Sequence, residues 1–127
     1  MARKAAQTYR DLIVWNAAMD SVEDVYRLSG LFPKEELYGL TSQMRRSAVS
    51  VASNIAEGYG RENRGSFVQF LRVAQGSLKE LETQVLIAGR IGILASDGEA
   101  ALLRRSEETG KMLRSLIRSI QSEQADE

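Results

Sequence analysis

The chain has 127 residues, enough for one domain with a buried core. Seventeen basic and seventeen acidic residues give a formal net charge of zero, so the strongly basic balance of many nucleic-acid-binding domains is absent. The sequence contains neither cysteine nor histidine. Disulfides, thiolate metal sites, imidazole ligands and catalysis by Ser-His-Asp or Cys-His groups are therefore excluded.

The first predicted helix spans about residues 9–29. Apolar residues recur there at intervals of three and four, as on one face of an α-helix. These residues are Leu12, Trp15, Met19, Val22 and Tyr26. Ser29-Gly30 predicts the end of this helix, because glycine readily adopts the left-handed conformation that terminates many helices.

The second predicted helix spans about residues 33–59 and begins with Pro33 in its first turn, where proline is tolerated. Its apolar stripe consists of Leu37, Leu40, Met44, Ala48, Val51 and Ile55. Gly58-Tyr59-Gly60 predicts its end.

The last two predicted helices span about residues 64–92 and 97–122. Asn63 is the expected N-cap of the third helix, and Ser96 with Glu99 has the spacing of a capping box for the fourth. The third stripe consists of Phe67, Phe70, Leu71, Ala74, Leu78, Leu81, Val85 and Ala88. The fourth consists of Leu102, Leu103, Leu113, Leu116, Ile117 and Ile120.

This pattern predicts an all-α protein with a single domain over residues 1–127. Four amphipathic helices with short connections favour an antiparallel up-down-up-down four-helix bundle. No segment alternates between polar and apolar residues over a useful length, so strands are not expected.

A polar strip runs beside the apolar stripes of the second and third predicted helices. Its members are Gln43, Arg46, Ser50, Asn54 and Glu57 on the second helix, and Ser77 and Glu80 on the third. A hairpin turning at residues 60–62 would bring Arg46 level with Gly76 and Ser77, and Gln43 level with Lys79 and Glu80. We interpret the strip as a hydrogen-bonded seam inside the bundle or between subunits; the alternative is a solvated helix face.

Gly76 lies in the middle of the third predicted helix, where glycine costs about 1 kcal/mol relative to alanine. Its presence predicts a close approach between helices at that position; the alternative is a ligand bound there. The same helix carries apolar residues on both flanks of its stripe, namely Val68 and Leu86 on one side and Val73 and Ile91 on the other. These flanks indicate a subunit interface, unless neighbouring helices of the same bundle cover them.

The basic residues near the turn between the second and third helices are candidate nucleic-acid contacts. They are Arg45, Arg61, Arg64, Arg72 and Lys79. The alternative is an ordinary surface of mixed charge, since Glu57 and Glu62 lie nearby. Tyr59 is the only aromatic residue expected near this cluster for stacking on bases.

No motif for catalysis, cofactor binding or metal binding is present. The glycine-containing segment that begins at Gly58 follows a helix rather than a strand, and Glu80 and Glu82 point to different sides of their helix. We therefore expect no enzyme activity, no cofactor, no metal and no small-molecule substrate. The sequence also lacks a membrane span and a signal peptide, which predicts a soluble cytoplasmic protein without a membrane partner.

Three segments resemble a known family. They are RDLIVWNAA at residues 10–18, FPKEELYGLTSQMRRSAVSVASNIAEGYGR at residues 32–61 and FVQFLRVAQGSLKELETQVLIAGRIGIL at residues 67–94. The resemblance is to the four-helix-bundle proteins encoded in intervening sequences of bacterial 23S rRNA genes, and it is most specific in SNIAEG and GSLKELET. Tyr9 stands where the family often has Phe, and Val51-Ala52 where Ile-Pro is common.

This resemblance implies an up-down-up-down bundle that assembles as a homopentamer, without an established enzyme activity. A related branch, the accessory proteins of diversity-generating retroelements, consists of basic pentamers that bind nucleic acid and a reverse transcriptase. We therefore expect a non-enzymatic bundle that self-assembles as a scaffold or binding accessory. The alternative function is an RNA- or DNA-binding accessory protein that uses the basic patch around the turn between the second and third helices.

Overall fold

A computed structural model describes residues 6–125, and over that range the chain is helical, with no strand. The elements, in which η denotes a short 3-10 helix, are η1 Tyr9–Asp11, α1 Ile13–Ser29, η2 Lys34–Glu36, α2 Leu40–Gly60, α3 Arg64–Arg90 and α4 Ser96–Ala125.

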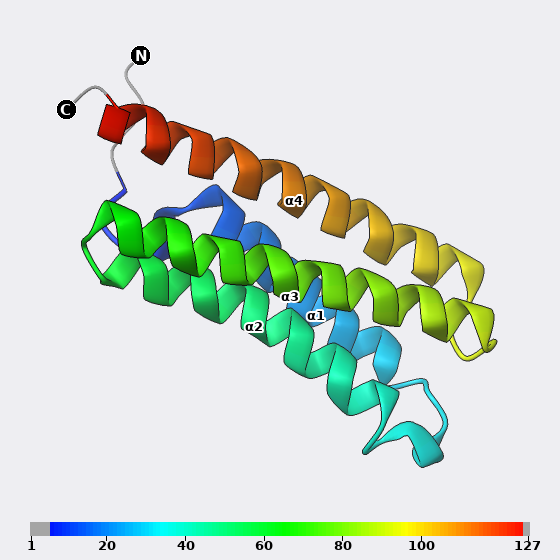
Figure 1. The fold of residues 1–127 in the computed structure, drawn as a ribbon. Coiled ribbons are helices and arrows are strands. Elements are labelled where there is room, and N and C mark those ends of the chain that lie inside the picture. Colours follow the sequence, from blue (N-terminus) through cyan, green and yellow to red (C-terminus); the bar gives the residue numbers. More distant parts are fainter. Residues whose placement is uncertain (1–5, 126–127) are drawn as a thin grey trace.

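Consecutive α-helices run in opposite directions, so that η1, the α2–α3 turn and the end of α4 lie at one end of the bundle (Figure 1). Helix α1 packs against α2 and α4, and α3 packs against the same two helices. In the part of the chain that the structure describes, the backbones of the diagonal pairs α1–α3 and α2–α4 do not approach each other as closely as those of neighbouring helices. The up-down-up-down four-helix bundle is therefore confirmed.

The first helical segment is not continuous, contrary to the prediction of one helix over residues 9–29. Thr8 and Asp11 form a capping box around η1. Leu12 is then extended, with φ −76° and ψ 126°, and α1 begins only at Ile13. The reciprocal hydrogen bonds of Thr8 and Asp11 stabilise a separate short turn, which the apolar spacing alone does not reveal.

The second helix also begins later than predicted. Pro33 has an extended ψ of 145° and precedes η2, and α2 starts at Leu40. The carboxylate of Glu36 accepts a hydrogen bond of 3.1 Å from the backbone N–H of Leu40. This contact satisfies one of the free N–H groups at the start of α2 and places a negative charge at the positive end of its dipole.

Helix α1 ends at Ser29 as predicted, and one of the three predicted cap residues, Asn63, is confirmed in its role. The side chain of Asn63 accepts a 2.8 Å hydrogen bond from the Ser66 N–H, as expected of an N-cap. Ser96, in contrast, already lies inside α4 rather than before it. Gly30 has a right-handed conformation, whereas Gly92, with φ 81°, takes the left-handed one after α3.

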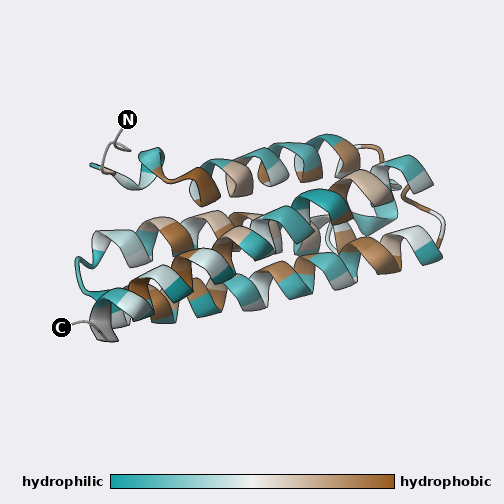
Figure 2. Ribbon diagram, turned by 90° about the horizontal axis from the view of Figure 1, so that it is seen from above, coloured by the Kyte–Doolittle hydropathy of each residue, from teal (hydrophilic) through white to brown (hydrophobic). Residues whose placement is uncertain are grey.

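The core forms where the four predicted stripes meet. Apolar residues recur in short bands along every helix (Figure 2). The largest fully buried apolar side chains are Met44, Ile55, Leu71, Leu81, Leu102, Leu113, Ile117, Val25 and Val85. The gap in the stripe of α4 is filled by the buried hydroxyl residues Ser106 and Thr109. The Thr109 hydroxyl donates to the carbonyl of Arg105 at 2.9 Å, so its burial leaves no unmet hydrogen bond.

Candidate interaction surfaces

The middle of the polar strip joins α2 to α3. The hydroxyl oxygens of Ser50 and Ser77 lie 2.7 Å apart, in a hydrogen bond in which either can donate. The Asn54 amide donates to the Ser50 carbonyl at 2.8 Å and to its hydroxyl at 3.1 Å. Ser77 is buried and the other two are half-buried. These three residues form an uncharged seam between the two helices, which we call the hydroxyl seam.

The ends of the strip lie on the surface. Gln43, Arg46, Glu57 and Glu80 are exposed, and Glu57 forms an ion pair of 3.1 Å with Arg61, the residue that follows α2. Ser77 contacts Ser50, one helical turn beyond the expected Arg46. The register differs because the hairpin turns further along than expected, through Arg61–Asn63, with Glu62 in a left-handed conformation at φ 55°.

The close approach between helices occurs at Gly58 rather than at Gly76. A β-carbon on Gly58 would lie 2.6 Å from Cβ of Phe70 and 3.1 Å from a ring carbon of Phe67. A β-carbon on Gly76 would meet no atom within 4 Å, and Gly76 is exposed. The prediction for Gly76 is therefore wrong within the protomer, because no neighbouring helix comes close enough to touch a side chain at that position.

The candidate nucleic-acid contacts do not form one cluster. Arg45 lies at the opposite end of α2 from Arg61 and is committed to α1. Its guanidinium donates to the Ser29 hydroxyl at 2.9 Å and to the Tyr26 carbonyl at 3.4 Å, and it lies 4.5 Å from the centre of the Tyr26 ring. Arg45 therefore lies at the C-terminal end of α1, where a positive charge is favourable. This position fits a structural role for Arg45.

Three of the other four basic residues have acidic partners. Arg61 pairs with Glu57, Arg64 lies 3.7 Å from the carboxylate of Glu123, and Lys79 pairs with Glu82 at 3.1 Å. Arg72 instead donates to the neutral side chain of Gln75 at 3.2 Å.

Charge is separated along the bundle even though the whole chain is neutral. The half with the α2–α3 turn comprises residues 6–18, 50–77 and 110–125, and it has seven basic and four acidic side chains. The other half, residues 19–49 and 78–109, has eight basic and eleven acidic side chains. Opposite charges therefore predominate at the two ends.

Several apolar residues of α3 remain exposed within the protomer. Val73, Leu86 and Ile91 have exposed fractions of 53%, 44% and 56%. Ile87, which the sequence analysis did not single out, is also exposed at 44%. Val68, in contrast, packs against the core. Neighbouring helices thus cover only one of the four apolar flank positions.

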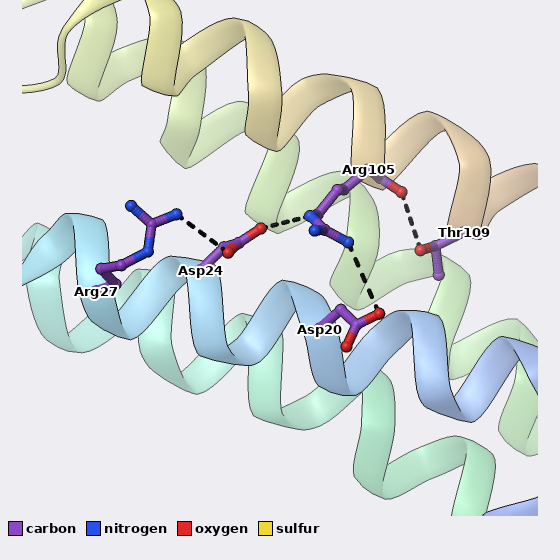
Figure 3. Close-up of polar contacts among 5 residues, drawn as sticks. All are labelled: Asp20, Asp24, Arg27, Arg105 and Thr109. Carbon is purple, nitrogen blue, oxygen red and sulfur yellow. Dashed lines mark hydrogen bonds and ion pairs between the residues drawn. The ribbon is translucent and has the colours of Figure 1, made fainter.

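An ion-pair network between α1 and α4 was missed by sequence analysis (Figure 3). Arg105 pairs with Asp24, and its second guanidinium nitrogen lies 3.8 Å from the carboxylate of Asp20. Asp24 also contacts Arg27 at 3.2 Å. Asp20 and Asp24 are four residues apart on an acidic helix, and this spacing places two carboxylates on one helix face. The sequence did not identify Arg105 as the partner of these two carboxylates.

Residues 6–125 offer neither a metal site nor a membrane span. No group of three or more acidic side chains in this range has a geometry that could hold a metal ion. No helix in the same range is both long and apolar enough to cross a membrane.

The fold and surfaces define an antiparallel four-helix bundle with exposed apolar and basic patches. The chain belongs to the 23S rRNA-intervening sequence protein family, whose model matches residues 10–115. Its fold is similar to the crystal structure of a protein of unknown function from the S23 ribosomal protein family of Bacteroides thetaiotaomicron. The TM-score is 0.78 at 21% identity, covering 84% of this chain and 96% of that one. No curated protein matches the chain.

Proposed function

We propose that this protein is a non-enzymatic bundle that assembles with copies of itself and serves as a scaffold or binding accessory. The observation that carries the proposal is the row of exposed aliphatic residues Val73, Ile87 and Ile91 on α3. An isolated protomer would leave this row in water. Exposed apolar side chains that recur on one side of a helix support a protein–protein contact.

The position of the row argues against a role in the protomer's own core. With 3.6 residues per turn, Val73 and Ile87 lie within about 40° of each other on α3, and Ile91 is the residue that follows the last turn of this helix. Val73 and Ile87 lie on nearly the opposite side of the helix from the buried Leu78. We call Val73, Ile87 and Ile91 the outer row of α3.

A second copy of the chain is the partner that we propose for the outer row. A net charge of zero creates no strong mutual repulsion between copies. Identical subunits usually satisfy such contacts by closing into a symmetric ring. The homopentamer implied by the family resemblance is our expected assembly.

Light scattering after size exclusion tests the assembly. We expect a mass near five times 14.1 kDa for the native chain. The triple variant Val73→Gln, Ile87→Gln, Ile91→Gln should elute as a monomer, because polar side chains remove the apolar contact. Circular dichroism should remain helical, since all three positions are exposed.

A matched control replaces three exposed apolar residues away from α3, namely Ile13→Gln, Leu31→Gln and Leu37→Gln. It should keep the native mass. A native chain that is monomeric at all concentrations would overturn the proposal. If both triple variants dissociated, the role assigned to the outer row would be wrong.

Nucleic-acid binding is a second candidate function, which the separation of charge along the bundle favours. Phosphate backbones are attracted by local positive potential even when the whole protein is neutral. The excess of basic side chains at the end with the α2–α3 turn supplies such a region.

A further inference from the structure

Two runs of basic residues without intervening acids lie on neighbouring helices. Between Arg64 and Lys79, α3 carries Arg72 but no Asp or Glu. Between Glu108 and Glu123, α4 carries only the cations Lys111, Arg114 and Arg118. Their spacing of three and four places these three side chains on one side of α4.

The antiparallel packing of α3 and α4 brings the two runs together. Arg64 contacts Glu123 near one end of the pair, and Gly110 lies against Leu78 further along. In the register set by these two contacts, Arg72 lies level with the turn between Arg114 and Arg118.

The cations of α4 are not neutralised within the protomer. In the structure of residues 6–125, no carboxylate lies within 4.0 Å of a charged nitrogen of Lys111, Arg114 or Arg118. All three residues are exposed. The helix dipole does not account for them, because its effect is confined to the last turn and α4 continues to Ala125.

A depression of about 320 Å³ lies in the groove between these helices. Its lining includes the cations Lys79 and Arg114, the amide of Gln75, and two glycines, Gly76 and Gly110. The absence of side chains on both glycines leaves room beside the charged groups. An anionic group the size of a phosphate fits this combination of space, charge and hydrogen-bond donors.

We propose that this surface binds the phosphodiester backbone of a nucleic-acid strand. We call it the α3–α4 basic face and define it by Arg72, Lys79, Lys111, Arg114 and Arg118. The inference rests on the second candidate function above and moves its site from the α2–α3 turn to the groove between α3 and α4.

The dimensions and composition of the face favour this ligand. Seven residues separate Arg72 from Lys79, and also Lys111 from Arg118, which corresponds to about 10 Å along each helix. That length is greater than the spacing between neighbouring phosphates, so the face can contact more than one phosphate of the same strand. Besides the cations, the depression is lined by Gln75, glycines and the buried Leu78, without the exposed aromatic or large apolar residues that membrane insertion requires. The absence of aromatic residues from this lining also predicts binding without stacking on bases.

The test uses fluorescence anisotropy with a labelled single-stranded RNA of mixed sequence at low and moderate salt. The site variant is Lys111→Gln, Arg114→Gln, Arg118→Gln. We expect native binding that weakens as salt rises, and a loss of at least about tenfold in affinity for the site variant at low salt. The slope of log affinity against log salt should decrease by about two for a single strand, given three lost phosphate contacts.

The matched control is Lys34→Gln, Arg90→Gln, Arg104→Gln, which removes the same charge from exposed positions at the other end of the bundle. It should retain affinity within about twofold. An equal loss in both variants would indicate a nonspecific charge effect and overturn the site. A third variant, Arg61→Gln with Arg64→Gln, tests the α2–α3 turn. If the site variant kept its RNA affinity and this double variant lost it, the binding site would lie at the α2–α3 turn instead.

Two further outcomes concern the ligand. Native protein that binds no RNA at low salt would reject the second candidate function together with this site. Binding to vesicles of anionic phospholipid, without binding to the RNA, would reject the nucleic-acid backbone as the ligand. Circular dichroism of both triple variants should match the native chain, because the altered residues are exposed.

Discussion

Helices α2 and α3 are joined differently from helices α1 and α4. At the α2–α3 interface, Gly58 lies directly against Phe70, and an uncharged hydrogen bond connects Ser50 to Ser77. At the α1–α4 interface, Arg105 reaches across the surface to Asp20 and Asp24. The first interface depends on close packing and the second includes partly exposed ion pairs.

This difference predicts opposite sensitivities. A close-packed contact responds to added volume and hardly to salt, because no net charge is involved. Exposed ion pairs tolerate changes in side-chain volume, but they weaken as salt screens the charges. Substitutions at each interface, measured by chemical denaturation at two salt concentrations, can therefore separate the two kinds of contact.

The largest effect is expected for Gly58→Ala. The added β-carbon would lie 2.6 Å from Cβ of Phe70, which is held close to its backbone and cannot rotate away. Overpacking costs about 1–3 kcal/mol, and the better helix propensity of alanine offsets about 1 kcal/mol. We expect a net destabilisation of up to about 2 kcal/mol, unchanged by salt.

The control for this variant is Gly60→Ala, two residues further along α2. A β-carbon at Gly60 would meet no atom within 4 Å, so alanine there should be neutral or should stabilise the helix by up to about 1 kcal/mol. If Gly58→Ala were at least as stable as Gly60→Ala, the tight contact between α2 and Phe70 would be refuted.

The next effect has the opposite sign and concerns Gly76→Ala. Because no atom lies near this position within the protomer, alanine should stabilise α3 by about 1 kcal/mol through its helix propensity. The denaturation midpoint should rise while the mass from light scattering stays the same. A lower midpoint or a smaller mass would mean that a neighbouring subunit packs on Gly76.

Most of the fold could be predicted because helix formation and burial leave a periodic signal. The stripes through Met44 on α2 and Leu81 on α3 face the core as expected. The errors lie at helix starts, such as those after Leu12 and Pro33. There, local hydrogen bonds made by Asp11 and Glu36 decide the boundary, and apolar periodicity does not report them.

The candidate sites could be predicted only in part because they depend on register and on cross-helix contacts. The sequence places Ser50 and Ser77 in one polar strip, and the structure joins them directly. The sequence assigned Gly58 to the end of a helix and Gly76 to close packing, whereas the close contact lies at Gly58. Only the arrangement of helices reveals which glycine has a neighbour and which cations, such as Arg45, are already engaged.

The hydroxyl seam should contribute a moderate, salt-independent effect. A double-mutant cycle with Ser50→Ala and Ser77→Ala should give a coupling energy of about 0.5–1.5 kcal/mol, the usual net value of a hydrogen bond. Arg46→Ala, on the same polar strip but exposed, should change stability by less than about 0.5 kcal/mol. A coupling of zero would show that the two hydroxyls interact with water instead.

The smallest effect is expected at the α1–α4 interface, for Arg105→Gln. The Arg105 side chain is 44% exposed and its partner Asp24 keeps a second contact with Arg27, so the loss should be about 0.5 kcal/mol at low salt. It should vanish near 1 M salt, where the screening length falls to about 3 Å. Arg104→Gln removes the same charge from the adjacent exposed position, for which the described residues provide no ion pair, and serves as the control. A loss for Arg105→Gln that persists in high salt would mean that packing by its aliphatic stem, rather than charge, joins α1 to α4.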